Sequence, residues 1–294
     1  VCVGNRIYTC MSGGIPGTLQ KDCLGLSCVM GKCVPPKCDP GARLVYVVDS
    51  TYRLLSFDPS KESNHFTLIK KLSCPANSPW PSRPAPATPF SMSVDRSARA
   101  WVLYTSGAIF WVNTKTGICK ASPYQKGQKG FQLFGMGFVS DKIGSDSEKL
   151  YVTRAQLNGF EPQTLGYVDP ATMKLTTVGT MPQSQYSAEL SGTSKAELYG
   201  YHPGNNTFVS RVDPKSGKAL KTWKLPAAGG QVGAWAFAHW GGKFYIFITT
   251  ASGLSQKTKV LRLDPSNGNV MTFLPSIPYR TVGAGVSTCA PALG

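Results

Sequence analysis

One acidic side chain occupies a position at which related segments of this sequence carry no charge. Glu189 is the fourth residue of YSAEL (186–190), and four similar segments have these residues at the same place: Ser93, Gly137, Trp235 and Gly285. A buried acid needs a hydrogen-bond partner or has a raised pKa, and either property can mark a functional site. Glu189 is therefore the one candidate for proton-transfer chemistry, and the alternative is that it only accepts structural hydrogen bonds.

Catalytic chemistry has little further support in the sequence. Glu161 and Asp49 are the only other obvious acids expected on the same face, too few for a paired-carboxylate hydrolase or a calcium-dependent lactonase. His65, His202 and His239 lie far apart without metal-ligand spacing, and no Gly-x-Ser-x-Gly nucleophile motif occurs. We expect no metal and no cofactor, and we do not favour an enzyme.

Aromatic, amide and guanidinium side chains are frequent in the segments between the apolar runs. Flat rings stack on sugar faces, and amides and guanidinium groups bond hydroxyl and carboxylate groups, so this composition is typical of saccharide recognition. An ordinary mixed polar surface has the same composition, which is the alternative. The candidate ligand-binding residues are Tyr52, Arg53, Trp80, Arg83, Tyr124, Gln185, Tyr186, Tyr201, His202, Asn206, Tyr279 and Arg280.

The charge balance favours an acidic partner. The chain has 31 Lys and Arg against 15 Asp and Glu, a net charge of +16, which suits an anionic polysaccharide, another anionic polymer or a membrane surface. Lysines on the expected outermost strands also protect unpaired strand edges, which is the alternative. These lysines are Lys70, Lys71, Lys120, Lys174, Lys218, Lys221 and Lys224. Aromatic residues are not interleaved with them as in a nucleic-acid module, so nucleic acid is disfavoured.

The elements that must position these residues repeat five times. The small-residue segments FSMSV, FGMGF, YSAEL, VGAWA and VGAGV begin at 90, 134, 186, 232 and 282, so their starts are 44, 52, 46 and 50 residues apart. Turns built on Asp-Pro or an equivalent follow four of them: WVNTKTG, YVDPATM, RVDPKSG and RLDPSNG. Four antiparallel strands in about 45 to 50 residues is typical of a propeller blade. The sequence therefore predicts an all-β, five-bladed β-propeller over residues 44–294.

The C-terminal segment is expected to close the ring. A fifth turn, SFDPSKES, has no small-residue strand before it, and VGAGV has no such turn after it. We therefore expect residues 282–286 to pair with residues 44–48, because an unpaired inner strand edge is otherwise exposed. The interblade linkers and the loops between second and third strands then emerge on one face, at the mouth of the central channel. Close packing around the axis of five blades is sufficient to explain the small residues of the inner strands.

Six of the nine cysteines lie within the first 38 residues. We expect residues 1–43 to form a disulfide-rich module from an oxidising compartment, with disulfides involving Cys2, Cys10, Cys23, Cys28, Cys33 and Cys38. A zinc site is the alternative, but close Cys-x2-Cys pairs are missing. The chain order places Cys38 beside Cys289, so we expect these two to form a disulfide. Because nine is odd, one cysteine is free or bonded elsewhere, for example upstream of Val1.

Three segments carry a resemblance to known proteins. DCLGLSCVMGKC (22–33), WAFAHWGGKFYIFI (235–248) and GVSTCAPALG (285–294) together resemble secreted or lipid-anchored, Cys-rich β-propeller proteins of myxobacteria. The resemblance implies export and a propeller, and it implies no particular chemistry. A lipid anchor upstream of Val1 is compatible with it, and no apolar run approaches the roughly 18 residues that span a bilayer.

We therefore expect a bacterial protein that is extracellular or on the outer cell surface and that binds without catalysis. Its ligand is expected to be a glycan, an envelope polymer or another anionic extracellular polymer, or a surface protein bound through the same loop face. Two alternatives stay open. One is an enzyme of the propeller lactonase or glycan-lyase type centred on Glu189 and the channel mouth, and the other is a structural surface protein that self-assembles through its N-terminal module.

Overall fold

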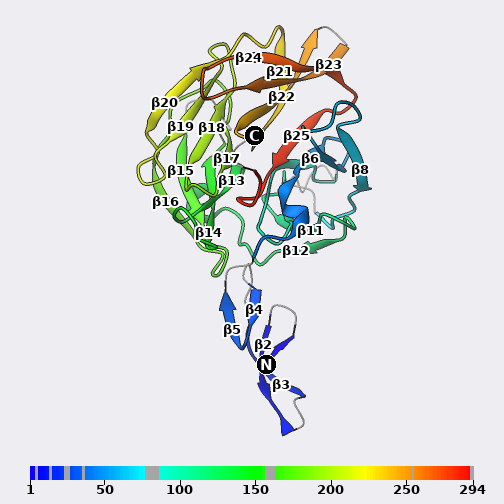
Figure 1. Ribbon diagram of the computed structural model, residues 1–294, viewed down its shortest axis with the longest axis vertical. Coiled ribbons are helices and arrows are strands. Elements are labelled where there is room, and N and C mark those ends of the chain that lie inside the picture. Colours follow the sequence, from blue (N-terminus) through cyan, green and yellow to red (C-terminus); the bar gives the residue numbers. More distant parts are fainter. Residues whose placement is uncertain are drawn as a thin grey trace.

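The sheets that follow the N-terminal module form a closed ring. The computed structural model describes residues 1–3, 6–12, 15–22, 27–34, 37–76, 86–155, 163–252 and 255–291. Five four-stranded antiparallel sheets are arranged around a central axis (Figure 1). The protein is therefore a five-bladed β-propeller, as the repeats predict.

Each blade runs from an inner strand at the axis to an outer strand at the rim. Blade one consists of β25 (Thr281–Gly285), β6 (Val45–Asp49), β7 (Arg53–Phe57) and β8 (Phe66–Lys71). Blade two consists of β9 (Pro89–Val94), β10 (Arg99–Tyr104), β11 (Ile109–Asn113) and β12 (Cys119–Ala121). Blade three consists of β13 (Phe134–Ser140), β14 (Glu148–Arg154), β15 (Thr164–Val168) and β16 (Leu175–Thr180).

The last two blades have the same order. Blade four consists of β17 (Glu189–Gly192), β18 (Leu198–His202), β19 (Phe208–Val212) and β20 (Ala219–Lys224). Blade five consists of β21 (Gln231–Trp240), β22 (Lys243–Ser252), β23 (Ser255–Leu263) and β24 (Val270–Ile277). First strands begin on one face of the ring, which we call the mouth face, and they end on the opposite face, which we call the turn face.

Two small sheets precede the ring. One contains β1 (Cys2–Val3), β2 (Arg6–Cys10) and β3 (Pro16–Asp22), and the other contains β4 (Ser27–Val29) and β5 (Lys32–Val34). Figure 1 shows both sheets outside the ring, and the 3-10 turn η2 (Pro40–Arg43) leads from them into blade one. A second 3-10 turn, η3 (Gln128–Gly130), lies between blades two and three. No helix within the described residues is long and apolar enough to cross a membrane.

The C-terminal strand completes the first blade. β25 pairs antiparallel with β6, with Gly283 opposite Val48 and Gly285 opposite Tyr46. This pairing confirms the predicted ring closure, since both chain ends contribute to one sheet. A disulfide between Cys38 and Cys289 joins the same two segments covalently on the turn face, as the chain order predicts.

The other cysteines differ in part from expectation. Cys2 is disulfide-bonded, whereas Cys10 is an exposed free thiol, which corrects its predicted place in a disulfide. Cys10 lies opposite Pro16 in the β2–β3 pairing, and an odd cysteine count leaves one thiol over. Sequence reasoning also missed the disulfide between Cys74 and Cys119, which joins the outer parts of blades one and two. Cys28 lies opposite Cys33 across β4 and β5, and Cys23 lies outside the described residues.

Apolar side chains pack between neighbouring blades. The described residues form five buried hydrophobic clusters, and each contains side chains from two adjacent blades. Between blades two and three, the fully buried Trp101 ring meets Phe138 edge-on at a centroid distance of 5.4 Å. The alternation of side chains along each strand therefore supplies both faces of every blade with apolar surface, and burial of that surface stabilises the ring.

Close contact between inner strands requires their small residues. A Cβ atom added at Gly135 would lie 2.2 Å from the carbonyl oxygen of Ala188 on the next blade. One at Gly283 would lie 2.9 Å from the backbone nitrogen of Met92. Packing around the axis therefore explains the glycines at Gly135, Gly137, Gly283 and Gly285.

The turns on the turn face are built as their sequences predict. Asp213 Oδ1 accepts a hydrogen bond from the backbone N–H of Lys215 at 3.0 Å between β19 and β20. The same side-chain cap occurs in the other four blades, at Asp58, Asn113, Asp169 and Asp264. These caps stabilise the tight reversal between third and fourth strands.

Candidate functional site

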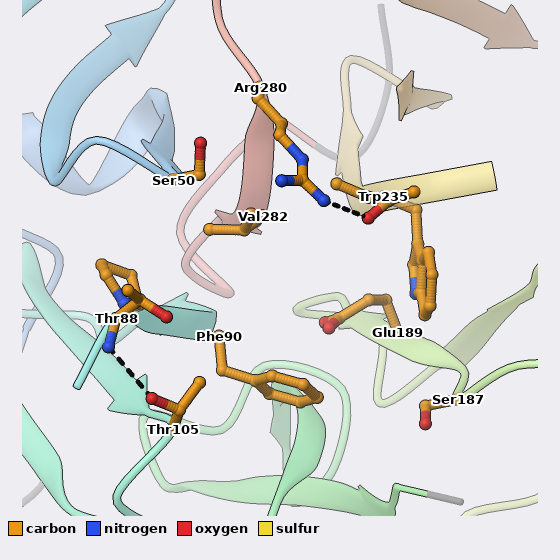
Figure 2. A pocket seen from close by; sticks show the side chains of 12 residues that line it. Ser50, Thr88, Phe90, Thr105, Ser187, Glu189, Trp235, Arg280 and Val282 are labelled. Atoms are coloured by element: carbon orange, nitrogen blue, oxygen red, sulfur yellow. Dashed lines mark hydrogen bonds between the residues drawn. The ribbon is translucent and has the colours of Figure 1, made fainter. Parts of the chain in front are cut away.

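A pocket opens at the centre of the mouth face. Its volume is about 440 Å³, and its walls come from the loop after β6, from the loop after β10 and from the starts of four inner strands. The residues that line it are Ser50, Thr88, Pro89, Phe90, Thr105, Ser187, Glu189, Gly233, Ala234, Trp235, Arg280 and Val282. Figure 2 shows side chains from opposite sides of the ring converging on this space, which we call the mouth pocket.

Glu189 forms the base of the mouth pocket. Its side chain leaves the first residue of β17 and is 3% exposed. Oε2 accepts a hydrogen bond of 2.8 Å from the Ser91 hydroxyl of blade two, and the carboxyl also accepts one from the backbone N–H of Met136 in blade three. One carboxyl therefore connects three successive blades, and the small inner strand of blade three leaves room for this crossing.

Burial decides the charge of this acid. Loss of water around the carboxyl raises the pKa of Glu189 well above its ordinary value, while the hydrogen bonds from Ser91 and Met136 act in the opposite direction and are weaker. The uncharged acid is thus favoured at the base of the pocket. A protonated carboxyl can donate a hydrogen bond as well as accept one.

Arg280 lies at the rim, just before β25. Its side chain is exposed, and one guanidinium nitrogen donates a 2.7 Å hydrogen bond to the carbonyl of Gly233 (Figure 2). That carbonyl is the partner found for this guanidinium among the described residues, so further N–H donors are available to a ligand. Because Gly233 has no side chain, the guanidinium can approach the β21 backbone; a Cβ atom there would lie 3.6 Å from it.

Aromatic rings supply the apolar part of the wall. Phe90 and Trp235 are both half-buried, so part of each ring faces the pocket. Behind Trp235, Tyr186 stacks at a centroid distance of 5.6 Å and an angle of 30°, which holds the indole in place. Trp235 and Glu189 occupy the same position in the repeat, at which the other inner strands have Ser or Gly. The two large residues at that position are a signal that sequence reasoning used for Glu189 and missed for Trp235.

The structure brings together some of the predicted site residues. Arg280 and the candidate acid Glu189 line the mouth pocket, and Gln185 and Tyr186 line a neighbouring hollow on the same face. Asn206 is exposed in the turn between β18 and β19. Trp80, Arg83 and Glu161 lie outside the described residues.

A second group of predicted residues forms contacts of its own on the mouth face. Arg53 bonds the buried Asp49 carboxylate through Nε, and its guanidinium lies 4.9 Å from the centroid of the Tyr279 ring. Tyr52 packs against the hydrophobic cluster between blades one and two, and its φ is +69°. These contacts hold the loop after β6 and the linker before β25 together, beside the mouth pocket.

Three predicted ligand-binding residues belong to the core instead. Tyr124 packs edge-on against Phe134 and is 6% exposed, and Tyr201 is fully buried in the cluster between blades four and five. His202 is also fully buried; its Nε2 lies 2.8 Å from the Ser210 hydroxyl, and burial lowers its pKa to about 3. The prediction was wrong for these residues because they lie close to loops in sequence while their side chains point between the blades.

A second buried acid lies on the turn face. Glu148 Oε1 accepts a 3.0 Å hydrogen bond from the backbone N–H of Arg96, and Oε2 accepts one of 2.8 Å from the Thr288 hydroxyl. Burial and the nearby Asp95 raise the pKa of Glu148 to about 8, against the two hydrogen bonds and the Arg96 charge. Glu148 thereby joins blades two and three to the segment after β25. No pattern in the sequence indicates this contact.

The described residues hold no cluster of side chains that could bind a metal ion. Within the described residues, no three His, Cys, Asp or Glu side chains are placed to hold one metal ion. The arrangement at the mouth pocket instead offers aromatic faces, hydroxyl groups, one buried acid and one guanidinium, which is a set of groups for binding a polar ring.

The chain was compared with family models, curated proteins and solved structures. No family model matches the chain, and no curated protein matches it. Among solved structures the chain is similar to Kuenenia stuttgartiensis hydrazine synthase, with 14% sequence identity, coverage of 84% of this chain and 69% of that chain, and a TM-score of 0.41. A likeness at this level carries no information about ligand or activity. The resemblance to Cys-rich propellers of myxobacteria stays a prediction.

Proposed function

We propose that the protein binds an acidic sugar residue of an extracellular polymer in the mouth pocket, without catalysis. The observation that carries this proposal is the charge of the pocket. Among the described residues that line it, only Glu189 and Arg280 are ionisable. Burial raises the pKa of Glu189 and disfavours its negative charge, whereas Arg280 contributes a positive charge on a side chain whose geometry suits a carboxylate.

The rest of the wall suits a sugar ring. Phe90 and Trp235 offer aromatic faces to the C–H groups of a ring, and the hydroxyl groups of Ser50, Thr105 and Ser187 are within the same lining. The volume of about 440 Å³ falls within the range of small-molecule pockets, about 300 to 1,000 Å³. We therefore assign to the pocket one ring of a uronic acid.

An extracellular or cell-surface location agrees with the covalent bonds of the chain. The disulfides Cys38–Cys289 and Cys74–Cys119 persist in oxidising environments and are rare where thiols are kept reduced. A net charge of +16 also favours encounter with acidic polymers. The rim lysines contribute to that general attraction, and the mouth pocket supplies specific recognition.

Glucuronic acid and glucose provide the test, because they differ only at C6, which is a carboxylate in glucuronic acid and a hydroxymethyl group in glucose. We expect a ligand-observed NMR titration to show binding of glucuronic acid and weaker binding of glucose. Arg280→Gln should lower the affinity for glucuronic acid by about tenfold to a hundredfold, since a charged hydrogen bond contributes about 1.5–3 kcal/mol. Trp235→Ala should weaken both sugars, because the stacking face is shared.

Lys221→Gln is the matched control for charge. It removes the same single charge from β20 at the rim, away from the pocket, and should leave both affinities unchanged. Equal losses in Lys221→Gln and Arg280→Gln would show that only net charge matters. Absence of binding by glucuronic acid would overturn the proposal.

Glu189 gives a second candidate function, because its raised pKa suits a general acid. The alternative is a glycan lyase or lactonase in which this carboxyl donates a proton. The described lining offers no second proton-transfer group beside it, which favours binding. Glu189→Gln keeps the shape of the side chain, so a binding protein should retain its affinity for glucuronic acid at neutral pH. Turnover of an acidic polymer that disappears in Glu189→Gln would favour the enzyme.

A further inference from the structure

A second hollow lies next to the mouth pocket on the same face. Its volume is about 560 Å³, and residues 185–186, 204–205 and 227–232 line it. These segments are the linker into β17, the loop from β18 to β19 and the linker into β21. We call this space the side hollow; it lies at the junction of blades four and five.

The two spaces share a wall. Trp235 lines the mouth pocket, Tyr186 lines the side hollow, and the two rings stack on each other at 5.6 Å. Chain neighbours divide in the same way, since Val232 lines the side hollow and Gly233 the mouth pocket. Figure 2 shows Trp235 and Ser187 together on one side of the mouth pocket. Tyr186, the chain neighbour of Ser187, and Val232 line the side hollow, so the two spaces adjoin there.

The side hollow carries no formal charge. Gln185, Asn205 and Gln231 supply amide side chains to its lining. The Gln185 amide is held in place, because Oε1 accepts from the backbone N–H of Asn205 at 2.9 Å and Nε2 donates to the Tyr186 hydroxyl at 3.3 Å. Gly229 has open space around its Cα, so a ligand can approach the backbone there. Amide, hydroxyl and backbone groups without an ionised side chain suit a neutral sugar ring.

A third hollow continues outward along blade five. Its volume is about 240 Å³, and it shares Ala228 and Gly229 with the side hollow. Lys257 and Lys259 line it from β23; being two residues apart on one strand, they project from the same face. We call this space the lysine hollow. The described residues of its lining include two lysines and no acid, so they give this hollow a positive charge.

The charges along these three spaces follow an order. Arg280 marks the first, the second has no charge, and two lysines mark the third. The Glu189 carboxyl, which reaches Ser91 across the inner strands, lies beneath the first space. Because the side hollow adjoins the mouth pocket and shares Ala228 and Gly229 with the lysine hollow, a polysaccharide whose end ring occupies the mouth pocket can continue through the other two spaces.

We infer that the mouth face binds the end of a polysaccharide whose acidic and neutral sugars alternate. The terminal acidic ring occupies the mouth pocket, a neutral ring occupies the side hollow, and the next acidic ring meets the lysine hollow. This inference rests on the proposed function, because it takes the mouth pocket as the site of an acidic sugar.

Hyaluronan fragments test the inference, since glucuronic acid alternates with a neutral N-acetylated sugar in them. Calorimetric titration should compare glucuronic acid, the disaccharide and the trisaccharide with acids at both ends. We expect affinity to rise about tenfold at each step, as each hollow is filled. Trigalacturonic acid, which is acidic at every ring, should bind more weakly than the trisaccharide because its central carboxylate meets an uncharged hollow.

Substitutions test which hollow causes each gain in affinity as the fragment is lengthened. Gln185→Ala should lower the affinity for the disaccharide and leave that for glucuronic acid unchanged. Lys257→Gln with Lys259→Gln should lower only the affinity for the trisaccharide, by about tenfold. The control is Lys221→Gln with Lys224→Gln, which removes two charges from the outer strand β20 and should change none of the affinities.

The outcomes separate the two proposals. No binding by glucuronic acid or by any fragment overturns the proposed function and this inference together. Equal affinity for all three fragment lengths overturns the inference and leaves the proposed function in place. Tighter binding of trigalacturonic acid than of the trisaccharide overturns the alternation, and an equal effect of the control pair overturns the lysine hollow as a site.

Discussion

Raising the pH is expected to weaken the fold through Glu148. This carboxyl is buried between Arg96 and Thr288 on the turn face, and its pKa is raised from 4.5 to about 8. Between these two values the unfolded chain loses the proton while the folded chain retains it, so unfolding becomes progressively more favourable. The contribution of protonated Glu148 to the free energy of unfolding is fully present below about pH 4.5. It is lost as the pH rises to about 8.

The size of the effect follows from the shift. Each pH unit in this window lowers the free energy of unfolding by up to about 1.4 kcal/mol, so the loss from about pH 5.5 to about pH 8 is about 3 kcal/mol. Glu148→Gln removes the titration and keeps the shape. Its amide oxygen can accept from the Arg96 N–H, as Glu148 Oε1 does. Its NH₂ group can donate to the Thr288 hydroxyl, which reverses the direction of the hydrogen bond that Thr288 donates to Glu148 Oε2.

Urea unfolding of both proteins at several pH values measures the difference. We expect similar free energies of unfolding near pH 5.5 and an advantage for Glu148→Gln of about 3 kcal/mol near pH 8.5. Glu148→Leu separates shape from hydrogen bonding, because it leaves both donors unsatisfied and should be less stable at every pH. A difference between wild type and Glu148→Gln that stays constant across the range would refute the reasoning.

Two further outcomes follow from the ring. Replacing Cys38 and Cys289 together by serine should lower the free energy of unfolding by about 5 kcal/mol, because their disulfide spans 251 residues. Replacing Cys74 and Cys119 by serine should lower it by about 4 kcal/mol, because that disulfide spans 45 residues. Urea unfolding measures both changes. A change below about 1 kcal/mol for the first pair would contradict a role in ring closure. Gly135→Ala should lower the thermal midpoint strongly, because its Cβ would lie 2.2 Å from the Ala188 carbonyl oxygen. Gly233→Ala is the control, since its Cβ would lie 3.6 Å from the Arg280 guanidinium, at ordinary van der Waals contact. Equal midpoints for the two variants would show that the inner strands can separate.

The fold could be predicted because its determinants repeat. The Asp-Pro turns and the small-residue strands recur with a spacing that fits one blade, and the strand VGAGV has a partner only in the first blade. Ring closure and the Cys38–Cys289 disulfide follow from that order alone. The disulfide between Cys74 and Cys119 could not be predicted, because it depends on how the outer strands of neighbouring blades approach each other.

The mouth pocket could be predicted only in part. The linker position of Arg280 and the inner-strand position of Glu189 in the repeat place both residues at the mouth of the ring, where they line one pocket. Position in the repeat does not determine which way a side chain points, so it predicts Tyr201 and His202 at the loop face although both are fully buried between blades. Contacts such as that between Glu148 and Thr288 join residues 140 positions apart and leave no local pattern.

The bond between Cys38 and Cys289 also makes one covalent circle of everything between them. A protease that cuts once in any exposed loop of that stretch opens the backbone but releases no fragment, because the new ends remain linked through the sulfur atoms. Exposed loop tips are the preferred sites of proteolytic nicking, and a molecule cut there would remain in one piece until a reductant breaks the disulfide.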